Sequence, residues 1–262
     1  MTSLITSYTM LTANAAKTQD TLAKTGQAAR DIQYFQDNIG SIKTIDDFMN
    51  NTRIYNFAMK AYGLEDMSYA KAYMKKALTE GVSSSTAFAV KLSDPRFKAF
   101  VTAFNFAANG TATTSSDTLK TTTVDNYKKV LVEDQAGQTD DGLKLALYFK
   151  DNINSTSSIY GILGNKSLYT VVRTALGMPA AMSNIDIDQQ VKQIQAKFSL
   201  DDMKDPKKQD AFIKRFLAVY DMQNNTSANS NPAVQLISGD STATGISQST
   251  LLSLQSFKRF NS

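Results

Sequence analysis

Cysteine, histidine and tryptophan are all absent from the 262 residues of this sequence. Without cysteine and histidine the chain cannot build a Cys/His zinc site, an iron–sulfur cluster, a disulfide, or a Ser-His-Asp or Cys-His catalytic system. The catalytic arrangements that remain are Ser-Lys pairs, carboxylate pairs and all-oxygen sites for Mg²⁺ or Ca²⁺, and their side chains are also ordinary surface residues. No motif predicts a catalytic residue, a cofactor or a metal, so the composition favours a non-enzymatic protein.

Long apolar runs are also missing. No segment approaches the ~20 consecutive apolar residues that a membrane-spanning helix needs. The N-terminal stretch MTSLITSYTMLTANAAK has no basic region and is broken by Thr, Ser and Asn, so it predicts neither a cleavable signal peptide nor an anchor. We therefore expect a cytoplasmic protein, or one exported by a route that does not cleave such a peptide.

Neither sign of charge is in large excess. The chain has 28 Lys and Arg against 24 Asp and Glu, a formal net charge of +4. The densest cationic segment, residues 204–215, is interleaved with aspartates at spacings that suit ion pairs on a solvated helix face. This is weak support for a phosphate or nucleic-acid surface, and we predict no nucleic-acid partner.

Acidic pairs occur at Glu65-Asp66 and Asp201-Asp202. Each pair lies beside a predicted helix N-terminus, where the helix dipole favours carboxylates, so a structural role is the better hypothesis than acid–base chemistry. The aspartates between residues 186 and 205 do not follow the spacing of an EF-hand calcium loop.

Glycine-rich phosphate-binding loops are not indicated. Gly161, Gly164 and Gly177 lack the lysine spacing of a P-loop, and no strand precedes them as a dinucleotide-binding fingerprint requires. We expect these glycines at helix ends.

An internal repeat is the strongest pattern in the sequence. Residues 34–64 align without a gap to residues 148–178, at a constant offset of 114. Eleven of the 31 aligned positions are identical: Tyr34, Phe35, Asp37, Asn38, Ile39, Ser41, Ile45, Asn51, Tyr55, Ala61 and Gly63 with their counterparts. Asp94-Pro95 is echoed by Asp205-Pro206 at a slightly different offset. The pattern predicts a duplicated unit.

Helix signals recur within each copy. Thr44 and Asp47 have the form of a capping box, and a helix is expected over residues 52–62, closed by Gly63 and, in the second copy, by Gly177. Further amphipathic helices are predicted at 67–79 and 187–198. Each Asp-Pro pair should begin an aromatic-rich helix, and we expect the aromatics to be core or inter-repeat residues: Phe100, Phe104, Phe212, Phe216 and Tyr220.

These signals predict an all-α fold, or nearly so, in which the duplicated multi-helix unit has a pseudo-two-fold relation. A short extended segment is possible at 234–237 and a small helix at 247–257, while residues 124–133 should be helical after an irregular Ser/Thr-rich stretch at 108–123. The predicted divisions are an N-terminal helical segment (1–33), the first copy (34–108), a connector and helix (109–147), the second copy (148–223), and a polar linker with a C-terminal tail (224–262).

The Asp-Asn pairs are the candidate polar sites. Asp37 and Asn38 recur as Asp151 and Asn152, and such groups could form two pseudo-symmetric sites for a cation or a partner. The alternative, which the chemistry of these residues favours, is a helix end whose Asp and Asn cap the backbone.

The run at 37–108, which begins DNIGSIKTIDDFMNNTRIYNFAMKAYGLED, resembles the alphaproteobacterial domain-of-unknown-function family numbered 1217. The second copy, with LALYFKDNI and VVRTALGMP, is similar to the later half of that family, so the resemblance covers most of the chain. Family members are often encoded among flagellar basal-body and motor genes. The resemblance therefore implies a flagellum-associated role, without implying an activity or any functional residue.

Together these observations favour a non-enzymatic structural or adaptor protein of the bacterial flagellum. Its partners would be proteins of the basal body, rod, hook or export apparatus, and the chain would be cytoplasmic or exported through the flagellar apparatus. The alternative is a small-ligand-binding or hydrolytic protein with a pocket between the two copies. A deep pocket with convergent Asp, Lys and Tyr side chains would favour that alternative, and a filled aromatic junction would count against it.

Overall fold

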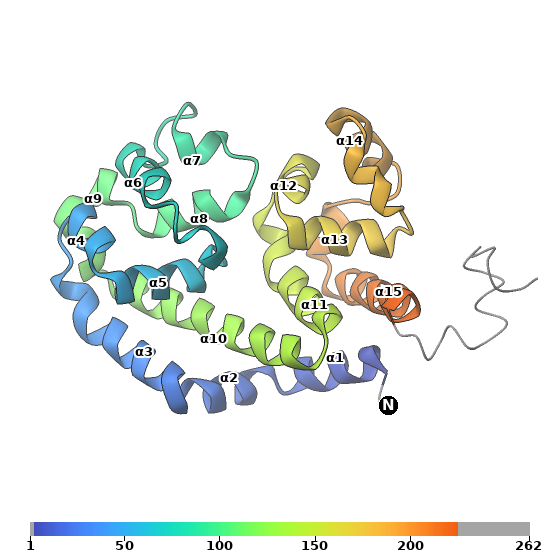
Figure 1. Cartoon of the computed structure of the whole chain (residues 1–262), viewed down its shortest axis with the longest axis horizontal. Helices are drawn as coiled ribbons and strands as arrows, with labels where there is room; N and C mark the ends of the chain where they lie inside the picture. The colour runs from blue at the N-terminus through green and yellow to red at the C-terminus, as the bar shows by residue number, and fades with distance from the viewer. Residues whose placement is uncertain (1–2, 225–262) are drawn as a thin grey trace, which may run out of the picture. The chain divides into compact units, whose positions relative to one another are not determined.

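The computed structural model describes residues 3–224, and every regular element in that range is helical (Figure 1), which confirms the predicted all-α fold. Met1–Ala218 form one compact unit, and Val219–Ser262 are assigned to a second. The last helix, α15 (Pro206–Asn224), crosses that boundary. The predicted extended segment at 234–237 and helix at 247–257 lie outside the described residues.

The N-terminal segment folds as three consecutive helices, α1 (Leu4–Ala13), α2 (Ala15–Ala23) and α3 (Gly26–Asn38). The Ser3 hydroxyl caps α1 by accepting a hydrogen bond from Thr6 N–H at 3.3 Å. Leu4 and Tyr8 are buried where α1 packs on α11, whereas α2 lies along α10 without burying any residue completely. The N-terminal helices thus follow the surface of α10 and α11 (Figure 1).

The first copy is built from short helices around an aromatic core. Thr44 and Asp47 form the predicted capping box, while the helix predicted from residue 67 begins later because a 3₁₀ turn comes first. The ring of Phe48 lies 4.9 Å from that of Phe104 and 6.2 Å from that of Phe100. The elements are η1 (Ile39–Ser41), α4 (Ile45–Asn50), α5 (Thr52–Ala61), η2 (Glu65–Met67), α6 (Lys71–Glu80), α7 (Phe88–Lys91), α8 (Pro95–Ala103) and α9 (Phe106–Asn109).

The connector is more ordered than the sequence predicted. It forms η3 (Gly110–Ser115) and the long helix α10 (Asp117–Thr139), which begins seven residues before the expected start at 124. Helix formation starts early because the Ser116 hydroxyl accepts a hydrogen bond from Leu119 N–H, and the buried Thr114 hydroxyl donates to the Ile42 carbonyl. Polar side chains that composition assigns to an irregular linker therefore serve as caps and anchors.

Helix α10 is shared between the two copies. Leu119, Val124 and Tyr127 belong to the core of the first copy, whereas the other end of α10 packs on α11 (Asp141–Asn152). Figure 1 shows α10 running beside α5 and on to α11.

The second copy repeats the local structure of the first. Helices α4 and α12 begin 114 positions apart, and α5 and α13 both begin and end 114 positions apart. Gly63 and Gly177 close α5 and α13 at φ 66° and 67°, as the sequence predicted. The common origin of the copies stays a prediction. The elements are η4 (Ile153–Ser155), α12 (Ile159–Leu163), α13 (Lys166–Ala175), η5 (Ala180–Asn184), α14 (Ile187–Gln195) and η6 (Asp201–Lys204), followed by α15.

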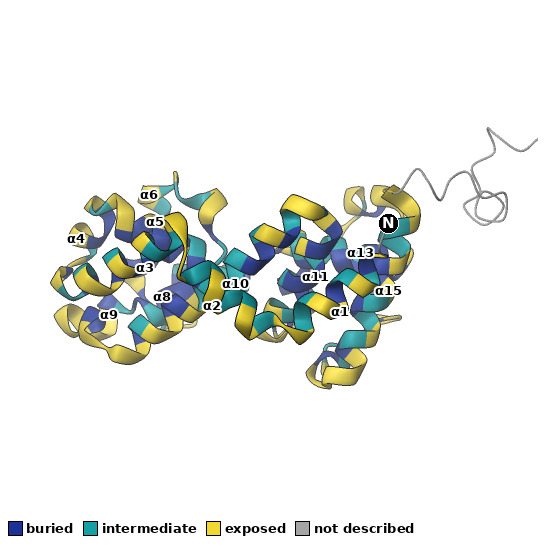
Figure 2. Cartoon of the chain, turned by 90° about the horizontal axis from the view of Figure 1, so that it is seen from below, coloured by how far each residue is buried: buried dark blue, intermediate teal, exposed yellow. Residues whose placement is uncertain are grey.

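The predicted aromatic core is largely confirmed. Phe100, Phe104 and Phe216 are completely buried, and Phe212 is partly buried against Phe149 and Phe198. Tyr220, which lies beyond Ala218, is also partly buried. In Figure 2 the buried surfaces of the helices face inward and the exposed surfaces face outward, as expected for amphipathic helices.

Candidate functional site

The two predicted Asp-Asn pairs lie at equivalent helix ends. Asn38 donates from Nδ2 to the Tyr34 carbonyl at 2.8 Å, and Asn152 donates to the Tyr148 carbonyl at 2.9 Å. Both asparagines therefore bind the last turn of their own helices, which is the capping role. The pairs are not brought together into one site, and the proposed binding role for them stays a prediction.

Asp37 and Asp151 differ in their surroundings. Asp37 is exposed on α3, and its carboxylate accepts a hydrogen bond from the Gln33 side chain at 2.8 Å. Asp151 is also exposed. Unlike Asp37, it lines a cavity of about 190 Å³ between the two copies. Of the candidate residues, Asp151 and Asn152 thus contribute to a cavity wall.

That cavity is formed by three parts of the chain. The first copy, helix α10 and the second copy each contribute to its walls. Charged and polar side chains converge there, namely Tyr62, Arg96, Asn126, Lys129, Glu133, Tyr148, Asp151, Asn152 and Ser155. The junction between the copies is therefore polar and hollow at this point, rather than filled with aromatic side chains.

Arg96 forms the wall on the side of the first copy. Its guanidinium donates to both carboxylate oxygens of Asp94, at 2.7–3.1 Å, and to the Gly63 carbonyl. Asp66 lies 3.5 Å away as a further ion-pair partner. Because Asp94 also caps α8 through Arg96 N–H, the predicted Asp-Pro helix start fixes the position of the guanidinium.

Tyr148 forms the wall on the side of the second copy. Its hydroxyl accepts a hydrogen bond from Asn165 Nδ2 at 2.7 Å. Burial raises the pKa of Tyr148, partly offset by the nearby charge of Arg96, so the phenol stays protonated at neutral pH. The backbone of Gly63 lies close to the Tyr148 ring, since a Cβ added to Gly63 would be 3.5 Å from that ring.

Two glycines, Gly161 within α12 and Gly164 at its C-terminal cap, permit close packing near Arg96. A Cβ on Gly164 would come within 2.9 Å of the Ser93–Asp94 backbone, and one on Gly161 would collide with the Thr156 hydroxyl at 2.0 Å. Gly161 lies inside α12 rather than at its end, which corrects the prediction that all three of these glycines terminate helices. Its role is close packing.

Glu133 is a buried acidic residue in the wall of the cavity. It is 4% exposed and has no hydrogen-bond partner within the described part of the chain. Burial, followed by the charges of Asp151 and Asp134, raises the pKa of Glu133 to about 8, against the opposing effect of Lys144 and Lys129. The carboxyl is therefore mostly protonated at neutral pH, and it can donate as well as accept a hydrogen bond.

Lys129 lies one helical turn before Glu133 on α10. Both residues line the cavity, and no carboxylate of residues 3–224 lies within 4.0 Å of the Lys129 ammonium group. By contrast, the neighbouring Lys128 forms ion pairs with Asp20 and Asp125 at 3.7 Å. Lys129 thus has no direct ion pair, and its positive charge acts on Glu133 and Asp151 in the cavity wall.

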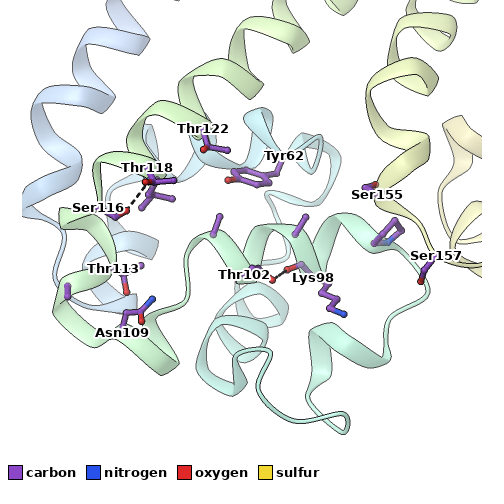
Figure 3. Close-up of a pocket in the computed structure, with 15 residues that line it drawn as sticks. Tyr62, Lys98, Thr102, Asn109, Thr113, Ser116, Thr118, Thr122, Ser155 and Ser157 are labelled. Atoms are coloured by element: carbon purple, nitrogen blue, oxygen red, sulfur yellow. Dashed lines mark hydrogen bonds between the residues drawn. The ribbon is translucent and has the colours of Figure 1, made fainter. Parts of the chain in front are cut away.

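A larger groove lies beside the cavity. It has a volume of about 1140 Å³ and shares Tyr62, Ala99 and Ser155 with the cavity. Figure 3 shows its labelled side chains, which are mostly threonines and serines from α8, η3, α10 and the start of the second copy. The buried Tyr62 hydroxyl lies near the Thr123 hydroxyl, but the two are not aligned for a hydrogen bond.

The Ser155 hydroxyl, which lies at both the cavity and the groove, is engaged with backbone. The Ser155 hydroxyl donates to the Asn152 carbonyl at 2.6 Å instead of to a base. Across residues 3–224, no three acidic side chains gather closely enough to hold a metal ion. Every helix in the same range is too short or too polar to cross a membrane.

Comparisons with known proteins agree with the fold. A crystal structure of a structural-genomics protein from Agrobacterium tumefaciens is similar, with a TM-score of 0.77 and 38% sequence identity over 84% of this chain and 93% of that one. A search of the curated proteins found no match. The model of a family described as "Protein of unknown function (DUF1217)" matches residues 61–209. This chain therefore belongs to the DUF1217 family.

Proposed function

We propose that this protein is a non-enzymatic structural or adaptor component of the bacterial flagellum that holds a segment of a partner protein in the groove beside α8 and α10. The partner would belong to the basal body, rod, hook or export apparatus. The flagellar assignment rests on the family resemblance carried by residues 37–108. The adaptor role rests on the groove.

The size and lining of the groove support a protein segment as its occupant. Its volume of about 1140 Å³ exceeds the 300–1,000 Å³ that is usual for small-molecule sites. Small and hydroxyl-bearing side chains dominate its walls, so a helix or extended segment can approach the backbone closely and form hydrogen bonds. Lys98, which is exposed and has no ion pair within residues 3–224, would favour an acidic residue on that segment.

Affinity purification of the full-length chain from motile cells tests this proposal. Thr122 is exposed and lines the groove, so Thr122→Arg should block the groove and abolish recovery of flagellar components. Thr121→Arg is the matched control, because Thr121 is the adjacent exposed threonine of α10 and does not line the groove. Equal recovery of flagellar proteins with both variants would show that the groove is not the partner site, and recovery of metabolic proteins alone would contradict the flagellar assignment.

A second candidate function is small-ligand binding in the cavity between the copies. The specific observation in its favour is that Lys129, Tyr148 and Asp151 line one cavity of about 190 Å³. We propose binding without hydrolysis, because the Ser155 hydroxyl donates to the Asn152 carbonyl and to no base within residues 3–224. The test is to denature the purified protein and identify the released small molecules by mass spectrometry. A bound molecule should copurify with wild type and be absent from Lys129→Met.

A further inference from the structure

We infer that the cavity between the two copies binds a small zwitterion of amino-acid size, with its carboxylate at Lys129 and its ammonium group between Glu133 and Asp151. This inference rests on the second candidate function and names the class of ligand.

The first step is the isolation of Glu133. Glu133 is only 4% exposed and forms no hydrogen bond within residues 3–224, and its carboxyl oxygens are not fully enclosed, so they keep access to open space. The residue lines the cavity of about 190 Å³, so a molecule in that cavity can supply the missing partner. Lys129, Glu133 and Asp151 also line a smaller cavity of about 40 Å³, together with Lys150 and with the uncharged Thr12, Ala15 and Gln19 of the N-terminal helices.

The second step is the balance of unpartnered charge. Lys129 and Glu133 are four positions apart on α10, which places such side chains next to each other on one helix face. Asp151 reaches the same cavity from α11 and, like Lys129, has no ion pair or hydrogen bond within the described chain. Lys150, the other lysine that acts on Asp151, lines the smaller cavity and not this one. Burial raises the pKa of Asp151, opposed by the nearby charges of Lys129 and Lys150. The cavity thus holds one lysine and one aspartate that lack a direct ion pair, and one uncharged acid.

A ligand that carries both a positive and a negative charge fits Lys129, Glu133 and Asp151 better than a ligand that carries a single charge. A simple anion at Lys129 would face the negative charge of Asp151, and a simple cation at Asp151 would face Lys129. Arg96 alters this balance little, because Asp94 already neutralises it at 2.7 Å. A zwitterion offers a partner to both Lys129 and Asp151 and adds no net charge to a partly buried space.

The size of the cavity sets the size of the ligand. Its volume of about 190 Å³ is below the range for drug-sized molecules, but it accommodates a compound of a few heavy atoms. The amide of Asn126, which has no hydrogen bond within residues 3–224, adds a further contact for the ligand carboxylate.

Protonation of Glu133 gives the proposed complex a distinctive signature. The pKa of Glu133 is about 8 in the empty protein, so the carboxyl is mostly neutral at pH 7. An ammonium group bound beside it favours the ionised form and lowers that pKa. Binding at pH 7 should therefore release a fraction of a proton, which is measurable as a difference in heat between buffers of different ionisation enthalpy.

The test uses three probes of similar shape on the full chain, each added to protein freed of bound small molecules. Alanine carries both charges, lactate carries only the negative one, and isopropylamine carries only the positive one. We expect saturable binding of alanine by calorimetry, with proton release, and at least tenfold weaker binding of the other two. Equal binding of lactate or isopropylamine would overturn the zwitterion assignment while leaving a ligand site in place. Failure of all three probes would overturn the zwitterion assignment, whereas the second candidate function fails only if purified protein also releases no small molecule on denaturation.

Variants connect the binding to the named residues. Lys129→Met, Asp151→Asn and Glu133→Gln should each weaken alanine binding at least tenfold, and Glu133→Gln should also abolish the proton release. Lys128→Met is the matched control, because Lys128 is the adjacent lysine, is already ion-paired and does not line the cavity. Thermal melting of every variant checks the fold. Unchanged alanine binding by a folded Lys129→Met variant would contradict the proposed site.

Discussion

Asn165 joins a helix cap to the wall of the cavity, because its Nδ2 donates to the Tyr148 hydroxyl at 2.7 Å while its Oδ1 accepts from the N–H groups of Ser167 and Leu168. The equivalent residue of the first copy, Asn51, caps α5 by accepting from Ile54 N–H at 3.1 Å. One capping position has thus gained a second contact in the second copy.

This difference predicts unequal effects of two equivalent substitutions. Asn51→Ala should lower the free energy of unfolding by about 1 kcal/mol, the usual effect of losing an N-cap. Asn165→Ala should lower it by roughly 2–3 kcal/mol, because the partly buried Tyr148 hydroxyl also loses its donor. Urea unfolding of both variants measures the difference. If the two losses are equal, the Tyr148 contact contributes nothing to stability.

The buried Glu133 predicts that stability falls as pH rises. Its pKa is raised from 4.5 to about 8 in the folded chain, so the folded state holds this proton more tightly than the unfolded state. The contribution is fully present below pH ~4.5 and is lost between pH ~4.5 and ~8, by about 1.4 kcal/mol for each pKa unit of difference. Glu133→Gln has no such proton, so the variant should match wild type near pH 4.5 and exceed it in stability near pH 9. Parallel pH profiles for the two proteins would contradict this.

The contact between the copies predicts sensitivity at one glycine. Gly164→Ala places a Cβ within 2.9 Å of the Ser93–Asp94 backbone, which should destabilise the chain by about 1–3 kcal/mol. Gly40→Ala is the control, since its Cβ would meet nothing within 4 Å. Differential scanning calorimetry should show a lower Tm for Gly164→Ala alone. A wild-type Tm for both would mean that the copies can separate here without loss.

The aromatic cores predict large effects of truncation in both copies. Phe104→Ala and Phe216→Ala should each lower the free energy of unfolding by roughly 3–5 kcal/mol, because both rings are completely buried. Tyr69→Ala should have little effect, since Tyr69 is 81% exposed. Chemical denaturation monitored by circular dichroism compares the three, and a small loss for either phenylalanine variant would show that its cavity refills by relaxation.

Local signals in the sequence predicted much of the helical architecture. The capping box at Thr44, the helix ends at Gly63 and Gly177 and the Asp-Pro starts are confirmed because each depends on a few adjacent residues. The early start of α10 was missed because Ser and Thr are typical of linkers as well as of caps. The role of Thr114 depends on a contact with the distant backbone of Ile42, which composition does not reveal.

The cavity was harder to predict than the fold. The sequence singled out Asp151 and Asn152, but it did not single out Lys129, Glu133 or Arg96. One signal existed for Glu133, which lies three positions before the buried Ala136 and so falls on the apolar face of α10. Arg96 carried no comparable signal, because its partners Gly63 and Tyr148 lie far away in the sequence and only the fold brings them close.

Helix α10 contributes buried residues to the core of the first copy and packs along α11 of the neighbouring region. Whatever the origin of the two copies, their evolution is coupled through this helix. Each copy can accumulate substitutions independently on the faces that it alone buries. A substitution on α10 alters the packing of both at once, so compensating changes should appear in α5 and α11 together.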